Sequence, residues 1–404
     1  MNPFSKAFCR IYQTCFHLAL PLLPYREPKV YHDLDDVKTI LKEEIHAKSV
    51  LLVTDKGLSQ TECFRLLKED VELSGVNVVV YDETSANPTV KNVNAAKKVY
   101  LDNKCDALIA YGGGSPMDCA KGVGALIAYP KKTINQMRGL LKVLRKIPPL
   151  IAIPTTAGTG SEVTITSVIT DSDTKYKYTI NSFTLIPYYA ILDPKVTISL
   201  PGKMTSTTGM DALTHATEAF IGRSTSKETE RLSLEAVKLI FDNILVAYDH
   251  PDNIEARKNM LLAAYKAGIA FSKSYVAYIH AIAHSLGGQY NIPHGLANAV
   301  IMPYLLKAYG KSAEKRLYRL GQAAGVVTKE DSIPEGAKKY IAAIEELNRK
   351  MGIPTTFPQI QEKDIPTMAK HAAKEANPLY PVPKLMNAKE LESFYHILKG
   401  EQHD

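Results

Sequence analysis

Residues 107–118 read ALIAYGGGSPMD, an apolar run that leads into three glycines and then into the start of a helix. Glycines let backbone N–H groups approach a ligand closely, and a helix N-terminus carries a partial positive charge. Ser115 suits the helix N-cap, Pro116 the first helical position, and Asp118 the place from which a capping acid reaches back. A diphosphate is the natural ligand of such a turn, although the pattern alone fits a tight strand-to-helix turn equally well.

Short β-rich runs alternate with helical stretches on both sides of this segment, between about Ser49 and Asp193. Continuously apolar strands that alternate with helices indicate a parallel sheet with helices on both faces. The expected strands are Val50–Thr54, Asn77–Tyr81, Ala107–Tyr111 and Leu150–Ile153, followed by a hairpin of Val163–Thr170 and Tyr176–Ile180 around the turn Asp171–Lys175. We therefore predict an α/β domain over residues 1–200, preceded in the same span by an N-terminal arm.

The character of the chain changes after Pro201. Long amphipathic stretches follow with few β-rich runs, and this pattern predicts an all-helical second domain over residues 201–404. The expected helices include Glu228–Ala247, Glu255–Phe271 and Ile333–Lys350. Two domains also suit a chain of 404 residues, which is too long for one ordinary core.

A second loop of special composition follows the apolar run at 150–153. Residues 154–162 read PTTAGTGSE and offer four hydroxyls on a flexible backbone, including those of Thr155, Thr156 and Thr159. Loops at the carboxyl ends of parallel strands converge on one crevice, where doubly wound folds bind ligands. Two such loops favour a nucleotide site over a threonine-rich surface turn.

Asp55 directly follows the first expected strand, in the sequence Thr54-Asp55-Lys56-Gly57. A carboxylate there can accept hydrogen bonds from both ribose hydroxyls of NAD, and it would repel the 2′-phosphate of NADP. The pattern alone favours the other interpretation, in which this aspartate caps the backbone of its own turn.

Five of the eleven histidines fall between His215 and His294, and four of these, His215, His280, His284 and His294, take part in suggestive spacings. Asp211 and His215 are spaced i and i+4, and so are His280 and His284, so each pair stands on one face of a helix. One carboxylate with three imidazoles suits a divalent ion such as Fe(II), Zn(II), Co(II) or Ni(II), and the lack of thiolates argues against a structural zinc site. The spacing does not decide which of His280 and His284 is the ligand.

The last histidine of this group is expected to come from a loop. Gly287 and Gly288 are expected to end the helix that carries His280, and His294 follows in the sequence Pro-His-Gly. A single histidine is usually an ordinary interior or surface residue, but this clustering beside a nucleotide crevice indicates a metal site.

At these residues the chain resembles the iron-containing (group III) alcohol dehydrogenase family, from about Pro28 to the C-terminus. The matching stretches occur in the family's order and spacing: Gly112–Asp118, Pro154–Glu162, Gly209–Ala219, Ala267–Phe271, His280–His284 and Pro293–Ala299. The chain departs from the family where Tyr31-His32-Asp33-Leu34-Asp35 replaces the usual glycine pair, and its N-terminal arm is longer than in many members.

The resemblance implies a dinucleotide-binding N-terminal domain and a helical C-terminal domain that holds a metal. The implied metal ligands are Asp211, His215, His280 and His294, and the resemblance makes His284 an active-site histidine that is not a ligand. The residues implied to bind or approach the cofactor are Asp55, Gly113, Gly114, Ser115, Asp118, Thr155, Thr156, Thr159 and Lys177, and Phe271 is implied to line the substrate pocket.

The expected activity is an NAD-dependent interconversion of a small primary alcohol and its aldehyde, with Fe(II), Zn(II) or another divalent metal. The resemblance implies direct hydride transfer to or from the nicotinamide while the metal holds the substrate oxygen. Dehydrogenases of glycerol and other polyols are near alternatives. A lyase of the dehydroquinate-synthase kind is less favoured, because the segments around the metal residues are mainly apolar and offer few basic groups for a phosphate-bearing substrate.

The composition excludes several other classes of protein. No run approaches the ~20 unbroken apolar residues of a membrane helix. The net charge of +7 is scattered along the chain, which argues against nucleic acid as a partner and suits a phosphate-rich cofactor. The five cysteines form no CxxC pair, and we expect reduced thiols in a cytoplasmic protein.

The N-terminal arm carries one apolar stripe at helical spacing. Its members lie three or four residues apart: Phe4, Phe8, Ile11, Cys15 and Leu18. Polar residues and a proline interrupt the stretch 11–23, and it has no small-residue cleavage site, so a secretion signal is not expected. We expect an arm that docks on its own subunit or on a neighbour, in a homo-oligomer, in preference to an address tag.

Overall fold

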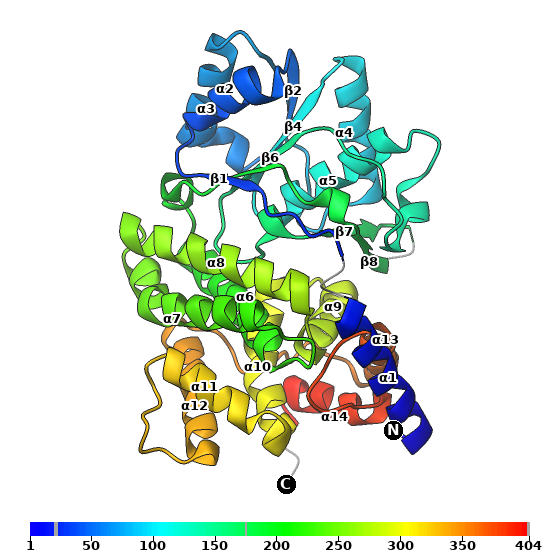
Figure 1. Ribbon diagram of the computed structural model, residues 1–404, viewed down its shortest axis with the longest axis vertical. Coiled ribbons are helices and arrows are strands. Elements are labelled where there is room, and N and C mark those ends of the chain that lie inside the picture. Colours follow the sequence, from blue (N-terminus) through cyan, green and yellow to red (C-terminus); the bar gives the residue numbers. More distant parts are fainter. Residues whose placement is uncertain (20–22, 174–175, 402–404) are drawn as a thin grey trace. The chain divides into compact units, whose positions relative to one another are not determined.

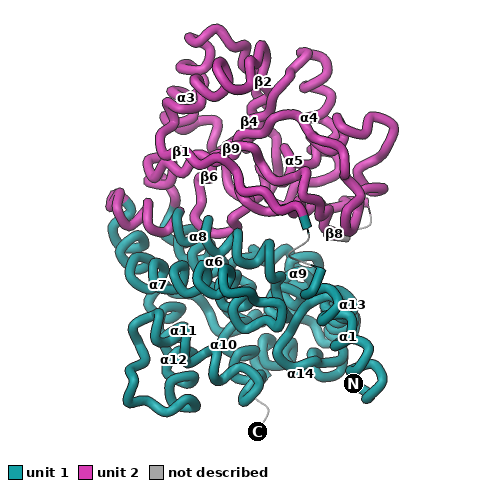
Figure 2. Tube along the Cα trace, viewed as in Figure 1, with its two compact units in different colours: residues 1–23, 201–251, 262–404 teal, residues 24–200, 252–261 magenta. Residues whose placement is uncertain are grey.

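The computed structural model describes residues 1–19, 23–173 and 176–401. It contains two compact units, drawn in different colours in Figure 2. The sheet unit comprises residues 24–200 and 252–261, and the helical unit comprises residues 1–23, 201–251 and 262–404. The chain passes between the units after residues 23, 200, 251 and 261, and the second crossing, at Pro201, is where the sequence placed the domain boundary. The N-terminal arm groups with the helical unit, whereas the division made from the sequence placed it with the sheet.

The sheet unit is built on six parallel strands in the order β1-β9-β6-β4-β2-β3. Their bounds are β1 Lys29–Tyr31, β2 Ser49–Val53, β3 Asn77–Tyr81, β4 Ala107–Gly112, β6 Leu150–Pro154 and β9 Tyr189–Ile191. Every residue of β2, β4 and β6 is buried, as expected for central strands with both faces covered.

Alternate residues of these strands enter two separate cores. Leu51 and Leu108 pack on one face with residues of α4 (Val90–Asp102) and α5 (Gly114–Ala128). Leu52 packs on the other face with residues of α3 (Glu62–Leu73) and α2 (Asp36–Thr39). Figure 1 shows these helices on the two sides of the strands. The predicted α/β fold class is confirmed, and so is the helical character of the second half.

The sequence pattern missed two strands of this sheet. β1 and β9 have three residues each and pair with one another in register, Val30 opposite Ala190. Segments so short carry no readable alternation. The predicted hairpin is present as the antiparallel pair β7 (Thr166–Asp171) and β8 (Tyr176–Asn181). The two-residue strand β5 (Gly139–Leu140) pairs with the other side of β8 and completes a second, three-stranded sheet. Part of its turn, residues 174–175, lies outside the described residues.

The helical unit is arranged around α6 (Gly202–Ile221), which is buried continuously from Gly209 to its end. α6 packs against α7 and α10, and α9 packs against α10 and α13. The remaining helices are α1 Pro3–Ala19, α7 Lys227–Asp249, α8 Ile254–Ser274, α9 Tyr278–Tyr290, α10 His294–Tyr309, α11 Glu314–Ala323, α12 Ile333–Lys350, α13 Ile365–Ala376 and α14 Ala388–Lys399. Short helical turns occupy Ile40–Ile45, Leu58–Gln60, Ile134–Met137, Ser161–Val163, Phe183–Leu185, Pro194–Thr197, Gly310–Ser312 and Glu362–Asp364.

The predicted N-terminal helix exists as α1, but its apolar stripe faces outward. Phe4, Phe8, Ile11 and Leu18 are each more than 60% exposed, whereas Cys9 and Gln13 are buried. The helix therefore docks through a mixed face that includes Cys9, Gln13 and Phe16, while its predicted apolar stripe stays exposed, contrary to the usual rule that the apolar stripe packs inward. Residues 20–22, at the end of the stretch weighed as a targeting signal, lie outside the described residues.

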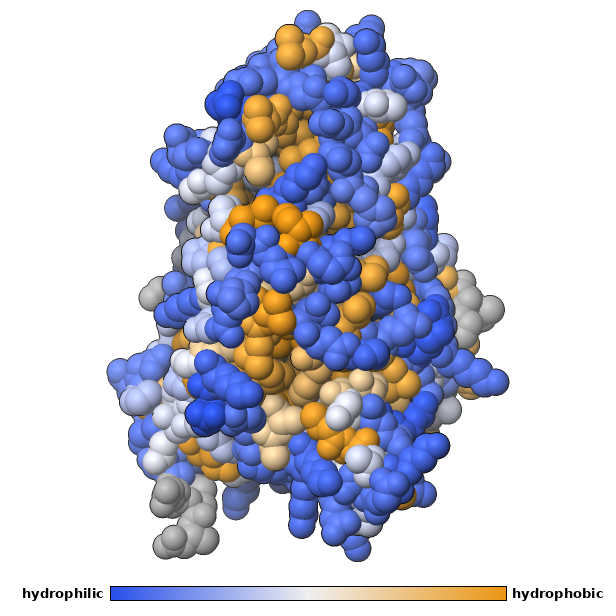
Figure 3. All heavy atoms as spheres, turned by 90° about the vertical axis from the view of Figure 1, so that its left-hand side faces the viewer, coloured by the Kyte–Doolittle hydropathy of each residue, from blue (hydrophilic) through white to orange (hydrophobic). Residues whose placement is uncertain are grey.

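Polar residues dominate the surface drawn in Figure 3, with hydrophobic side chains in groups between them. Among the described residues, no helix combines the length and apolar character needed to cross a membrane.

Candidate metal centre and cofactor loops

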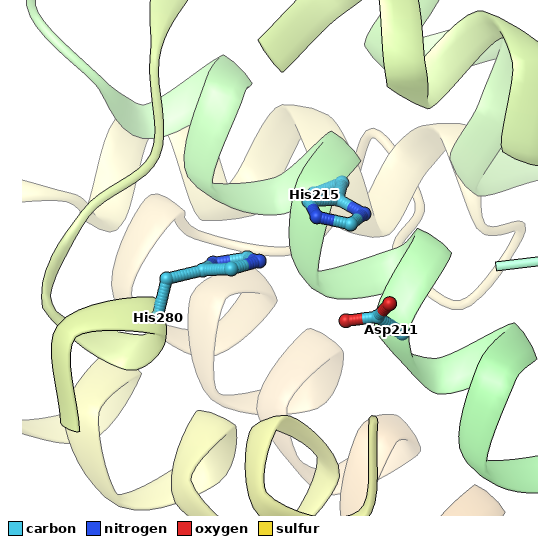
Figure 4. A group of neighbouring side chains, drawn as sticks. All are labelled: Asp211, His215 and His280. Atoms are coloured by element: carbon cyan, nitrogen blue, oxygen red, sulfur yellow. The ribbon is translucent and has the colours of Figure 1, made fainter. Parts of the chain in front are cut away.

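Three potential metal ligands meet inside the helical unit. Asp211 and His215 project from α6, one turn apart, and His280 projects toward them from the first turn of α9. One ligand atom from each residue lies within 4.8 Å of those of the other two, and all three side chains are buried. Figure 4 shows the three side chains pointing toward one another. Asp211 and His215 thus lie on one face of α6, as their i, i+4 spacing predicted.

His294 joins this group from a third helix. Its Nε2 lies 3.7 Å from Asp211 Oδ1, and its ring centroid lies 5.3 Å from that of His280. It is the first residue of α10, not part of a loop as expected. The next residue, Gly295, explains the close approach of α10 to α6, because a Cβ there would lie only 2.3 Å from the carbonyl oxygen of Thr207.

The helix that carries His280 is longer than predicted. α9 passes through Gly287 and Gly288 and stops after Tyr290, where Asn291 takes the left-handed conformation (φ 53°). Asparagine tolerates this conformation better than most residues and can replace glycine at a helix end. The helix therefore ends at Asn291, three residues beyond the glycine pair at which the sequence placed its end.

Glu218, one turn beyond His215 on α6, fixes the orientation of His280. Its carboxylate accepts hydrogen bonds from the backbone N–H groups of Ala277 and Ile279, each at 2.8 Å, and contacts His280 Nδ1 at 2.6 Å. Since the carboxylate serves as acceptor throughout, His280 carries its proton on Nδ1 and directs the Nε2 lone pair toward Asp211. Burial raises the pKa of Glu218 to about 7, against the effect of its backbone donors.

The donor set fits one divalent ion. Burial lowers the pKa of His280 to about 4, so the imidazole is neutral, the form that binds metals. The Asn298 side-chain Nδ2 lies among the ligand atoms, 2.6 Å from Asp211 Oδ1, 3.3 Å from His280 Nε2 and 3.2 Å from His294 Nε2. The convergence of a carboxylate and two imidazole lone pairs on one point is the arrangement that a cation requires.

His284 has a different set of neighbours. Its Nδ1 contacts Glu375 Oε1 at 2.7 Å, and the same oxygen accepts a hydrogen bond from the Tyr380 hydroxyl, also at 2.7 Å. Burial acts to raise the pKa of Glu375, but His284 and the Tyr380 hydroxyl together lower it. The ring of His284 stacks on that of His294 at 5.0 Å between centroids. His284 therefore borders the group of Asp211, His215 and His280 without belonging to it, and this geometry favours His280 as the ligand where the spacing left the two open.

Phe271 on α8 lies against this group as well. Its ring stacks on His215 with 4.1 Å between centroids and 13° between planes. An apolar wall of this kind suits the carbon chain of a small substrate.

In the sheet unit, the two loops singled out in the sequence are in direct contact. A Cβ on Gly113 would lie 3.0 Å from Thr156 Oγ1, and one on Gly114 would lie 3.0 Å from Thr159 Cγ2. The backbone N–H of Thr155 donates to the carbonyl of Gly112 at 3.0 Å. β4 and β6 are neighbours in the sheet, which explains why the loops after them meet.

The start of α5 differs from the expected one. Gly113 is the N-cap and the helix begins at Gly114, so Ser115 falls in the first turn, where its Oγ accepts from the backbone N–H of Asn87 at 3.3 Å. Asp118 does not reach back as a capping acid, and instead accepts from Ser161 Oγ at 3.3 Å. The early start leaves glycine N–H groups at the helix end, where phosphate binding requires them. The buried Thr155 Oγ1 has no hydrogen-bond partner among the described residues, as a cofactor-binding hydroxyl would.

Asp55 caps its own turn, as its sequence pattern suggested. Its Oδ1 accepts from the backbone N–H groups of Gly57 and Leu58 at 2.9 and 3.0 Å. It follows β2, the strand beside β4, and so lies at the same edge of the sheet as the glycine loop. Lys177 on β8 donates to Asn87 Oδ1 at 2.8 Å; burial raises the pKa of Asp118 to about 6, and the charges of Lys121 and Lys177 oppose this rise.

A buried lysine ties the two loops together, and the sequence did not reveal it. Lys121 on α5 is fully buried, and its Nζ, with three N–H groups, lies within hydrogen-bond distance of four oxygens: Ser161 Oγ, Thr164 O, Thr164 Oγ1 and Thr166 O, at 2.8 to 3.1 Å. Asp118 and Glu162 lie near enough for their charges to raise its pKa, although burial lowers it overall. Burial raises the pKa of Glu162 to about 7.

Sequence reasoning missed several residues around the metal group for two different reasons. Glu218 and Asn298 stand one helical turn from His215 and His294, so helical spacing alone could have found them. Glu375 and Tyr380 lie more than 90 residues from His284, and only the tertiary structure brings them to it.

Comparisons with known proteins bear on this arrangement. A family model described as "Iron-containing alcohol dehydrogenase" matches residues 30–194, and one described as "Fe-containing alcohol dehydrogenase family, C-terminal" matches residues 205–398. The 1,3-propanediol dehydrogenase of Klebsiella pneumoniae is 36% identical over 356 residues, which are 86% of this chain and 90% of the relative. The NAD-dependent methanol dehydrogenase of Bacillus methanolicus is 34% identical over 342 residues, covering 84% of this chain and 89% of the relative.

Solved structures give the same result for the fold. A 1,3-propanediol oxidoreductase superposes with a TM-score of 0.89 at 33% identity, over 93% of this chain and 99% of the other. The sulfoacetaldehyde reductase of Bifidobacterium kashiwanohense, solved in complex with NAD+, superposes with a TM-score of 0.83 at 28% identity, over 94% and 99%.

Proposed function

Because the chain belongs to the iron-containing alcohol dehydrogenase family, we propose that it interconverts a small primary alcohol and its aldehyde, using NAD and one bound divalent metal. The observation that carries the proposal is the buried group of Asp211, His215 and His280, whose ligand atoms lie within 4.8 Å of one another. His294, with its Nε2 3.7 Å from Asp211, would be the fourth ligand.

When bound, the metal supplies Lewis-acid polarisation of the substrate oxygen, and the dinucleotide supplies or accepts the hydride. The helical unit's own residues prepare the donor set: Asp211 offers a negative charge, and Glu218 holds His280 in the tautomer that presents Nε2. Preformed ligands of fixed orientation reduce the reorganisation that binding and turnover require.

His284 would move or hold a proton beside the substrate oxygen. Its Nδ1 faces Glu375, so Nε2 is the nitrogen available to a substrate. Phe271 would exclude water beside His215 and contact the substrate's carbon chain. The apolar wall favours a small uncharged alcohol.

In the sheet unit, the loop of Gly113 and Gly114 at the start of α5 would bind the diphosphate, and Thr155, Thr156 and Thr159 would supply hydroxyls. The cofactor residues also include Ser115, Asp118, Lys177 and Asp55. Asp55 would select NAD over NADP through its negative charge at the strand end, where Oδ1 caps the turn.

Three finer points belong to the same proposal. We expect Fe(II) as the metal loaded in the cell, with Zn(II) able to replace it, because carboxylate and imidazole ligands suit both. All five cysteines are free thiols, which supports a cytoplasmic location. We also expect a homo-oligomer, a dimer or larger.

The test combines metal removal with a substrate panel. The purified enzyme, stripped by a strong chelator and shown to be metal-free by elemental analysis, should lose turnover and regain it with Fe(II) or Zn(II). Primary alcohols and aldehydes of two to six carbons, with glycerol as a polyol control, are assayed through NADH absorbance. Full activity without metal, or no turnover of any alcohol or aldehyde by the loaded enzyme, would refute the proposal.

A further inference from the structure

The N-terminal helix α1 binds main-chain carbonyls of one irregular segment of the helical unit, residues 378–383. The Arg10 guanidinium donates to Val382 O at 2.7 Å and to Pro383 O at 2.9 Å. The Gln13 side-chain amide donates to Tyr380 O at 2.6 Å and Pro378 O at 3.2 Å. Figure 1 shows α1 beside α13, which immediately precedes this segment.

The two donors are themselves linked and shielded. Arg10 also donates to Gln13 Oε1 at 2.8 Å, so the amide is oriented with its N–H groups toward the segment. Gln13 is only 4% exposed. Every polar group of this buried side chain therefore has a hydrogen-bond partner, which accounts for a glutamine on the docked face of α1.

The segment held by α1 carries Tyr380, whose hydroxyl reaches the active-site pair. The Tyr380 hydroxyl donates to Glu375 Oε1, which is the oxygen that contacts His284 Nδ1. Aromatic rings form a second connection between α1 and Tyr380. The ring of Phe16 on α1 packs edge-on against that of Tyr275, with 5.1 Å between centroids, and the Tyr275 and Tyr380 centroids are 6.3 Å apart. One continuous set of contacts thus connects the arm to His284.

We propose that α1 is a positioning element for catalysis: Arg10 and Gln13 hold the 378–383 segment so that Tyr380 keeps Glu375 on His284. Residues 377–387 form no helix or strand, so their carbonyls have no regular ladder to fix them. Donors from α1 reach four of these carbonyls, and the backbone N–H of Arg223 reaches a fifth, Pro381 O, at 2.7 Å. The proposal rests on the role of His284 proposed above, and it gives the arm a function within its own subunit.

The docked face distinguishes this role from the others considered for the arm. An address tag needs no buried hydrogen bonds to the body of the protein, and an arm that serves only a neighbouring subunit acts through its exposed stripe of Phe4, Phe8 and Ile11. The face that the helix buries is instead the one that leads to Tyr380.

The test uses full-length, metal-loaded enzyme with the double substitution Arg10→Ala/Gln13→Ala, and Phe8→Ala as the control on the opposite face of the same helix. The double variant should lower kcat/KM about 10-fold, because small displacements of a catalytic group cost one to two orders of magnitude in rate. It should also shift the pH profile of kcat/KM, while metal content and the dissociation constant for NAD stay unchanged. Phe8→Ala should match the wild type.

Tyr380→Phe shows whether the effect travels along the proposed route. It removes the hydroxyl that contacts Glu375 and should lower kcat/KM by a similar factor. Added to the double variant, it should have little further effect, since both changes break the same chain of contacts. Multiplied effects, metal loss in the double variant, or a defect in Phe8→Ala equal to that of the double variant would overturn the proposal.

A readout without turnover separates this inference from the proposed activity. The rate at which diethylpyrocarbonate modifies His284, followed by mass spectrometry, should rise in the double variant and not in Phe8→Ala. An unchanged rate would overturn the positioning role. An enzyme that turns over no alcohol but shows the faster modification would refute the proposed function and leave the positioning role standing.

Discussion

Glu218→Gln perturbs the metal centre without touching a ligand. The wild-type carboxylate serves three donors: Ile279 N–H on Oε1, and Ala277 N–H and His280 Nδ1 on Oε2. Glutamine has the same shape but offers one acceptor oxygen and one NH2 group. Whichever way the amide turns, its NH2 faces at least one of these donors, and the best orientation keeps two contacts and loses one.

The size of the effect follows from that count. A buried N–H left without an acceptor costs about 1–3 kcal/mol of stability. With a neutral partner, His280 is held less firmly in the tautomer that presents Nε2, and loss of such support typically weakens metal binding ~10–100-fold, or about 1.4–2.7 kcal/mol. Since one orientation of the amide still accepts from His280, we expect the lower end for Glu218→Gln and the upper end for Glu218→Ala.

The assay is competition for Zn(II) between the enzyme and a chromogenic chelator, with thermal unfolding of the apo protein measured beside it. Glu345→Gln is the matched control, because this glutamate pairs with Lys307 on the surface of the same unit and has no contact with the metal group. Its metal affinity should equal that of the wild type. If Glu218→Gln binds Zn(II) within a factor of two of the wild type, the assignment of Glu218 as the residue that orients His280 is wrong.

Three further predictions concern other parts of the protein. His280→Ala should lose the metal, whereas His284→Ala should keep close to one metal per subunit while its kcat/KM falls. Elemental analysis and steady-state kinetics of both variants test this. Metal loss in His284→Ala with retention in His280→Ala would exchange the two roles. Asp55→Gly should narrow the preference for NAD over NADP, measured as the ratio of kcat/KM values, because it removes the charge that repels a 2′-phosphate; an unmoved ratio contradicts the assignment. Burial raises the pKa of Glu162 to about 7, so between about pH 4.5 and 7 the folded protein binds more protons than the unfolded chain. The free energy of unfolding of the wild type therefore falls as pH rises through this window. Chemical denaturation should therefore show Glu162→Gln gaining stability relative to the wild type from pH 4.5 to 7, and a difference that is constant with pH would show that Glu162 is not protonated there.

The local signals in the sequence were sufficient for the fold class and for the residues of the candidate site that share a helix. Continuous apolar runs such as those of β4 and β6 identify buried parallel strands, because only strands covered on both faces need no polar residues. The spacing of Asp211 and His215 placed both side chains on one face of α6, since helical geometry follows from the sequence positions alone.

Features that depend on partners distant in the chain were beyond these signals. Among the described strands, β1 pairs only with β9, about 160 residues away, and β9 lies between β1 and β6; their three residues each have no pattern of their own. The need for glycine at position 295, near the start of α10, also depends on a distant residue. A Cβ on Gly295 would lie 2.3 Å from the carbonyl oxygen of Thr207, and the sequence around Gly295 does not indicate that contact.

The different surroundings of His280 and His284 show most clearly what the tertiary structure decided. The two residues have the same type, the same helix and the same face, so spacing could not separate them. What separates them is the carboxylate that each Nδ1 meets: Glu218 from α6 turns His280 toward Asp211, and Glu375 from α13 holds His284 beside the group. Likewise the apolar stripe of the arm predicted its helix but not its docked face, because Arg10 and Gln13 find their carbonyl partners more than 360 residues away. Hydrogen bonds between segments so far apart leave no trace in a local pattern, and they form only once the chain has folded.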